Sequence, residues 1–204
     1  MFTYGGAANP DLNPEKAFNY ETGILHYINK YLTANFTFYW MYLDNEIWFD
    51  YTDRRYENYG RTSHLGLESG ASLKFCKGLT AFVNYSYTRA QNEAGEDKGK
   101  LLTNVPSNKC SFGGSYDTGI GLRASAVVTN VGASYIDPSN SDKLPDYITV
   151  DAKFDYNYKG LSLFLIIDNV LNRKYNTYGF KRFGAKYFSP APGRMFGAGA
   201  EVKF

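Results

Sequence analysis

The chain of 204 residues is rich in aromatic and small residues, with 19 Tyr, 15 Phe and 20 Gly, and is long enough for one domain or two. Its formal net charge of +2 at pH 7 is too small for a nucleic-acid-binding surface, and its two cysteines match no metal or redox spacing. Hydrophobic residues make up 44% of the chain, which excludes a disordered protein, and no run of apolar residues is long enough for a transmembrane helix.

Alternation with a period of two predicts β-strands along almost the whole chain. In YITVDAKFDYNY, at 147–158, every second residue is apolar, and the residues between carry hydroxyl, amide or charged groups. Such alternation is typical of a strand with one apolar and one wet face. In chain order we predict nine strands, at about 18–28, 31–43, 62–76, 79–90, 105–116, 120–131, 146–158, 161–170 and 193–204.

The connections alternate between short and long. Short ones at Asn29–Lys30, Lys77–Gly78, Asp117–Gly119 and Lys159–Gly160 have the composition of tight hairpin turns. Long polar ones cover about 44–61, 90–104, 132–145 and 171–192. This layout predicts an all-β, antiparallel up-and-down meander that forms part of a transmembrane β-barrel, with short periplasmic turns and long extracellular loops.

The distribution of charge supports a membrane environment. Mid-strand charges such as Glu68, Asp151 and Lys153 lie on the wet face, and the opposite face is apolar, with Trp and Tyr near the strand ends. A Lys or Arg facing lipid at the centre of a bilayer costs about 2–4 kcal/mol, so their scarcity on the apolar face is informative. A soluble β-barrel binding module also alternates and stays open as an alternative, but the long strands and the aromatic load favour the membrane.

Nine antiparallel strands cannot close into a barrel, because bacterial single-chain barrels have an even number of strands. An open edge in hydrocarbon leaves backbone groups unpaired at several kcal/mol each. Two solutions remain. Residues 1–8 add a tenth strand and make a small complete barrel, acting as a passive pore or a structural protein, or the chain is part of a larger barrel.

Three short motifs resemble those of TonB-dependent outer-membrane receptors. The first is NPDLNPE followed by YETG, the second is DNVLNRKY and the third is PGRMF, which opens a last strand with a terminal Phe. In the second motif, Val170–Leu171 stands where the family usually has Leu-Phe. The motif residues are Asn9, Pro10, Leu12, Pro14, Glu15, Tyr20, Glu21, Gly23, Asp168, Asn169 and Tyr175.

The resemblance implies that residues 1–204 are the C-terminal segment of such a receptor's barrel, in the bacterial outer membrane. It implies energy-coupled uptake of a scarce ligand, such as a ferric siderophore or cobalamin, with TonB contacted only through a plug domain outside this chain. Outer-membrane lipid and lipopolysaccharide are then its surroundings. Phe196, Val202 and Phe204 resemble the C-terminal signal read by the barrel-assembly machinery.

The long loops hold the candidate ligand contacts. Loop 171–192 is basic and aromatic without an acid, and loop 44–61 combines arginines and tyrosines with acids. Such loops suit an anionic, flat ligand such as a ferric catecholate, although lipopolysaccharide phosphates attract the same residues. The candidates are Arg54, Arg55, Tyr56, Arg61, Tyr178, Phe180, Lys181, Arg182 and Phe183.

No enzymatic chemistry is predicted. His26 and His64 lie in separate predicted strands, without a Ser/His/Asp signature or a metal spacing nearby. We therefore predict no catalytic residue, no metal site and no cofactor.

Overall fold

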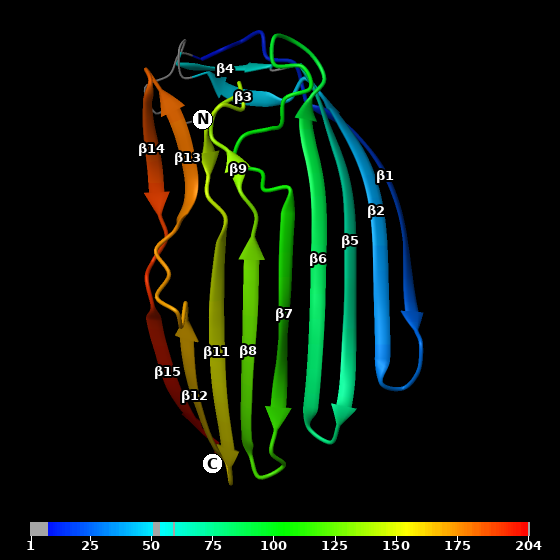
Figure 1. Ribbon diagram of the computed structural model, residues 1–204, viewed down its shortest axis with the longest axis vertical. Coiled ribbons are helices and arrows are strands. Elements are labelled where there is room, and N and C mark those ends of the chain that lie inside the picture. Colours follow the sequence, from blue (N-terminus) through cyan, green and yellow to red (C-terminus); the bar gives the residue numbers. More distant parts are fainter. Residues whose placement is uncertain (1–7, 51–53, 59, 204) are drawn as a thin grey trace.

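The chain folds into one large antiparallel sheet with small hairpins at one end (Figure 1). The computed structural model describes residues 8–50, 54–58 and 60–203. Neighbours in the sheet are consecutive along the meander, and its nine strands are β1 (Lys16–Tyr27), β2 (Leu32–Asp44), β5 (Arg61–Cys76), β6 (Leu79–Asn92), β7 (Asn108–Asp117), β8 (Leu122–Val131), β11 (Tyr147–Tyr158), β12 (Leu161–Asp168) and β15 (Met195–Val202).

The nine predicted strands and their order are confirmed, but the predicted long loops were incomplete. Three of those loops contain two-stranded hairpins that the alternation pattern did not indicate. They are β3 (Ile47–Asp50) with β4 (Arg55–Asn58), β9 (Ser134–Tyr135) with β10 (Lys143–Leu144), and β13 (Asn176–Arg182) with β14 (Ala185–Pro190). The described part of the chain is otherwise turn or irregular, and it contains no helix long and apolar enough to cross a membrane.

Short turns gather at one end of the sheet, which we call the turn end, and the hairpins gather at the other, the loop end (Figure 1). Gly78 shows why glycine is needed in such a turn. Its φ is +82°, and a Cβ there would lie 2.1 Å from the carbonyl oxygen of Asp117 on the next strand. The strand predicted at 120–131 begins two residues later, at Leu122, because of a hydrogen bond from Thr118. The N–H of Thr118 binds the Leu122 carbonyl at 2.9 Å, so residues 120–121 belong to the turn and not to the strand.

The two faces of the sheet separate by register. One rung of paired residues across β5, β6, β7, β8 and β11 is wholly apolar, and consists of Ala71, Val83, Phe112, Val128 and Val150. The rung beside it carries glycine, amide and hydroxyl groups, and consists of Gly70, Asn84, Ser111, Thr129 and Thr149. Adjacent residues on a strand point to opposite sides, so the sheet has an apolar face and a polar face.

The apolar face has no partner within the described chain. Among the described residues the buried hydrophobic side chains are Ala90, Ile136 and Leu144, all at the loop end, whereas Phe112 and Phe196 on the apolar face are 53% and 67% exposed. A soluble β-barrel would cover such a face with its own core, so this distribution argues against the soluble alternative.

The sheet is an open wall. Within the described residues, β1 and β15 each pair with one strand, β2 and β12 respectively. The hypothesis of a tenth strand at residues 1–8 falls almost wholly outside the described residues.

Candidate functional site

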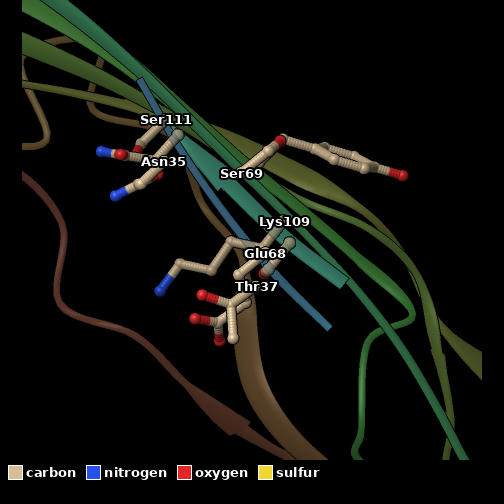
Figure 2. A pocket seen from close by; sticks show the side chains of 9 residues that line it. Asn35, Thr37, Glu68, Ser69, Lys109 and Ser111 are labelled. Atoms are coloured by element: carbon tan, nitrogen blue, oxygen red, sulfur yellow. The ribbon is translucent and has the colours of Figure 1, made fainter. Parts of the chain in front are cut away.

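The polar face carries a hollow about 310 Å³ in volume, midway along β5 and β6 and lined also by residues of β2 and of the first half of β7. One rung there joins Thr37, Glu68, Ser86 and Lys109 as successive Cα partners. In Figure 2 the side chains of Thr37, Glu68 and Lys109 project to the same side as Asn35 and Ser111, and Ser69 projects to the other. Both Glu68 and Lys109 are exposed, and among the described residues neither forms an ion pair. This wall is therefore suited to contact with water or polar groups.

Aromatic rings lie over glycines on the same face. A Cβ on Gly66 would lie 2.1 Å from the ring of Tyr39, whose hydroxyl reaches across to Thr88 Oγ1 at 2.8 Å. Phe164 covers Gly199 in the same way, because a Cβ on Gly199 would lie 2.4 Å from the Phe164 ring. Glycine is required because a ring laid flat on the neighbouring strand leaves no room for a side chain. Phe164 therefore lies on the polar face although its residue type suggests the apolar one.

The first motif binds the β3–β4 hairpin. Asn9 donates to the carbonyl of Tyr56 at 2.9 Å. The backbone N–H of Asn13 donates to the side-chain oxygen of Asn58 at 2.8 Å. The side-chain amide of Asn58 donates back to the Asn13 carbonyl at 3.0 Å. Glu15 accepts the Ile47 N–H at 2.7 Å.

The rest of this motif lies beside that contact or in β1. The turn residue Pro10 is exposed, Leu12 is half-buried and Pro14 is exposed. In β1, Tyr20, Glu21 and Gly23 pair with Trp40, Tyr39 and Thr37 of β2. The geometry matches a segment that anchors a loop-end hairpin to the first strand.

The second motif forms a tight turn around one buried side chain. Asn169 is 4% exposed and has a φ of +51°. The side-chain oxygen of Asn169 accepts the backbone N–H of Arg173 at 2.8 Å, and its side-chain NH₂ donates to the Arg173 carbonyl at 2.9 Å. The backbone N–H of Asn169 donates to the Asp151 carboxylate at 2.7 Å. Asp168 ends β12, and Tyr175 stacks on Tyr147 with ring centroids 4.1 Å apart.

The basic hairpin β13–β14 meets the acidic loop 132–145. Lys181 donates to Asp142 at 2.7 Å, and Lys186 forms a second ion pair with the same carboxylate. Hydrogen bonding from the two lysines lowers the pKa of Asp142, and Asp142 raises the pKa of Lys181. Loop 171–192 holds no acid of its own, as the sequence shows, but part of its positive charge at Lys181 and Lys186 is neutralised by Asp142 of a neighbouring loop.

Further contacts join residues 101–104, 134–144 and 176–190, which together we call the loop cluster. Asn104 exchanges two hydrogen bonds of 2.9 Å with the backbone of Gly179. Asp137, 5% exposed, organises its own loop. Burial raises the pKa of its carboxyl, but hydrogen bonds from Ser139, Ser141 and Asp142 outweigh this effect and hold the pKa at about 2.

The remaining candidate ligand residues divide into two separate groups. In the β3–β4 region, Arg55 pairs with Glu57 and Arg61 with Asp44, both at 2.6 Å. Arg54 is exposed at a φ of +53°, and Tyr56 packs edge-on against Phe49.

The β13–β14 hairpin carries the second group. Phe180 lies between Tyr178 and Tyr187, with centroids 6.2 and 4.9 Å away. The Arg182 guanidinium lies 4.9 Å from the ring of Phe183, which is 90% exposed. The two groups therefore lie at two different hairpins of the loop end, β3–β4 and β13–β14.

In the last strand, Phe196 and Val202 are 67% and 54% exposed, on the same side of β15. Phe204 lies outside the described residues. No group of three His, Cys, Asp or Glu side chains in the described ranges is placed to hold a metal ion.

A wall with one apolar face, one polar face, short turns at one end and structured loops at the other is a segment of a transmembrane β-barrel. The family model described as TonB dependent receptor-like, beta-barrel matches residues 1–170.

Individual proteins resemble the chain over much of its length. The pesticin receptor of Yersinia pestis is 24% identical over 197 residues, covering 93% of this chain and 29% of that protein. The ferrioxamine receptor of Yersinia enterocolitica is 26% identical over 125 residues, covering 57% of this chain and 18% of that protein. The crystal structure of the ferric yersiniabactin uptake receptor FyuA from Yersinia pestis aligns with a TM-score of 0.79 at 23% identity, covering 93% of this chain and 30% of that one.

The chain belongs to the family of TonB-dependent receptor β-barrels, which are outer-membrane proteins. It spans about three tenths of the length of the pesticin receptors that it resembles.

Proposed function

We propose that this chain forms the C-terminal barrel portion of an outer-membrane receptor that takes up a scarce ligand, with a ferric siderophore as the favoured class and cobalamin as a further candidate. Uptake is energy-coupled through TonB, which acts on a plug domain that lies outside these residues. The protein carries its ligand across the membrane without changing it chemically.

The polar face is the observation that carries this proposal. In a barrel wall whose apolar face meets lipid, the polar face lines the interior. The rung of Thr37, Glu68, Ser86 and Lys109 offers charge and hydroxyl groups there, at half the height of the wall. Two of the relatives' names, which refer to ferrioxamine and ferric yersiniabactin, support an iron chelate.

Loop-end aromatic residues are the proposed ligand contacts. Tyr178, Phe180 and Phe183 present rings on one hairpin, and Arg182 adds a cation beside Phe183. Aromatic faces and guanidinium groups suit flat, anionic chelates. Lys181, Arg55 and Arg61 contribute less charge to a ligand because each is paired with an acid of this chain.

Two further partners follow from the same proposal. Phe196, Val202 and Phe204 act as the signal for the barrel-assembly machinery. Lipopolysaccharide surrounds the loop end, and Arg54 is suited to its phosphates because it is exposed there.

Uptake of iron-55 chelates tests the proposal. Cells of the source strain lacking the gene regain uptake of one ferric siderophore when the gene is restored, and lose it again when TonB is deleted. Restored uptake that persists without TonB would favour a passive pore, and no change in uptake of any chelate or of cobalamin would contradict the proposal.

A further inference from the structure

A second cavity lies at the loop end, separate from the hollow in Figure 2. Its volume is about 240 Å³, and it lies between the ends of β5 and β6, the β3 segment, residues 101–105 and Pro138. The residues that line it include Glu46, Trp48, His64, Asn92, Leu101 and Leu102. Sequence reasoning assigned no role to Glu46 or Asn92 and found no partner for His64.

Asn92 is the first sign of a built site. The residue is 2% exposed, and its side-chain oxygen Oδ1 accepts no hydrogen bond from any described residue. Buried amide oxygens are nearly always paired, because an unpaired one has lost its water without compensation. Asn92 also lines the cavity, so a donor bound there is the candidate partner for this oxygen.

The Thr62 hydroxyl determines the proton positions on its two neighbours. Its oxygen lies 2.6 Å from Glu46 Oε2 and 3.3 Å from His64 Nε2. The ionised carboxylate only accepts, so the single hydroxyl hydrogen goes to Glu46, and Nε2–H of His64 must donate to Oγ1. In the neutral imidazole the other nitrogen, Nδ1, is then an acceptor.

The charge at the cavity is negative. Among the described residues Glu46 has no basic partner, and no Lys or Arg side chain lines this cavity. The rest of the lining is largely apolar, with the indole of Trp48 and the side chains of Leu101 and Leu102. Three acceptors, one negative charge and an aromatic wall together suit a cation with several N–H donors on an apolar stem.

We propose that this cavity binds a primary ammonium group carried on a short alkyl arm. Glu46 supplies the countercharge, Asn92 Oδ1 and His64 Nδ1 accept N–H donors, and Trp48 with the two leucines contacts the stem. The inference deepens the proposed function, because the cavity lies at the loop end of the same receptor. The group has two sources, a small free amine or the pendant amine of a larger ferric chelate.

Calorimetric titration of the complete polypeptide in detergent tests the inference, with n-butylammonium as the probe and n-butanol as its uncharged analogue. We expect n-butylammonium to bind, with quenching of tryptophan fluorescence that Trp48→Phe abolishes, and n-butanol to bind at least about ten-fold more weakly. Glu46→Gln should weaken n-butylammonium at least about ten-fold and Asn92→Ala several-fold. The matched control Glu96→Gln changes an exposed loop carboxylate outside the cavity and should have no effect.

A second pair of probes distinguishes the sources. A ferric hydroxamate chelate with a pendant aminobutyl arm should lose affinity on N-acetylation if the chelate is the source, and this difference should vanish in Glu46→Gln. Equal affinity of the two chelates, with n-butylammonium still dependent on Glu46, identifies a free amine.

Equal binding of n-butanol and n-butylammonium, or undiminished ammonium binding in correctly folded Glu46→Gln, would overturn the inference. Heat-dependent gel mobility verifies the fold of each variant. Glu46-dependent ammonium binding without TonB-dependent uptake refutes the proposed function alone, and uptake without ammonium binding refutes this inference alone.

Discussion

The nine-stranded wall and the loop cluster are held together by different kinds of interaction. In the wall, the same two patterns repeat from strand to strand, with an apolar rung through Val83 and Val128 beside a polar rung through Asn84 and Thr129. In the loop cluster each contact is individual, as between Asn104 and Gly179 or between Asp142 and Lys181. The stability of the wall therefore depends on the solvent that each of its faces meets, whereas the stability of the loop cluster depends on single side chains.

A lysine placed first on the apolar face and then on the polar face should give the largest difference in the stability of the barrel. Val128→Lys puts a charge on the apolar face and should destabilise the barrel by about 2–4 kcal/mol if that face meets lipid near mid-bilayer. Thr129→Lys, one residue further, puts the same charge on the polar face and should have little effect. Urea unfolding in lipid vesicles measures both, and equal destabilisation would show that the faces are not in different solvents.

Replacement of Asn169 should lower stability more than replacement of its neighbour Asn172, although both residues have φ near +50°. Asn169→Ala removes the side chain that holds the carbonyl and N–H of Arg173, and we expect a loss of about 2 kcal/mol from the unpaired buried groups. Asn172→Ala removes one hydrogen bond, from the Arg194 N–H at 3.0 Å, and should cost about 1 kcal/mol or less. Thermal unfolding compares the two, and a larger loss at Asn172 would contradict this account.

The loop cluster should weaken in acid before the wall does. The folded pKa of Asp137 is about 2, below its ordinary value of 3.8, so its stabilising effect is complete above about pH 4 and is lost as pH falls towards 2. The contribution is about 2 kcal/mol. Pepsin should cut within 132–145 faster at pH 2 than at pH 4, relative to an unstructured reference peptide.

Asp137→Asn supplies the control for this pH dependence. The variant lacks the titrating group, so the relative rate of cleavage should be high at both pH values. A parent protein whose loop is cut at the same relative rate at pH 2 and pH 4 would contradict the assignment to Asp137.

The smallest effect concerns ligand contact. Phe183→Ala removes a ring that is 90% exposed and should cost at most about 0.5–1 kcal/mol of stability from the lost contact with Arg182, whereas affinity for the transported chelate should fall a few-fold because the ring is a proposed ligand contact. Ile120→Ala removes another exposed apolar side chain, at the turn end, and should leave affinity unchanged. Equal affinity of both variants would remove Phe183 from the proposed contacts.

The wall could be predicted from the sequence because its pattern is local. Alternation along 147–158 defines the two faces of β11 without knowledge of any other strand. The loop cluster could not, because Asn104 is 75 residues from Gly179, and Asp142 is 39 from Lys181. A charge count over one loop cannot reveal that a neighbouring loop neutralises it. The cavity at Glu46, His64 and Asn92 was missed for the same reason, since its walls come from five segments.

Solvent access along β11 tests the central claim most directly. In a background with Cys76→Ser and Cys110→Ser, single cysteines at successive positions from 148 to 155 are labelled in vesicles with a membrane-impermeant thiol reagent. We predict labelling at Asp151, Lys153 and Asp155 and protection at Ile148, Val150, Ala152 and Phe154, with Thr149 also protected because it is buried at 7% exposure. Labelling without a period of two over positions 150–155, or protection of the charged positions instead of the apolar ones, would contradict the assignment of one face to lipid and the other to water.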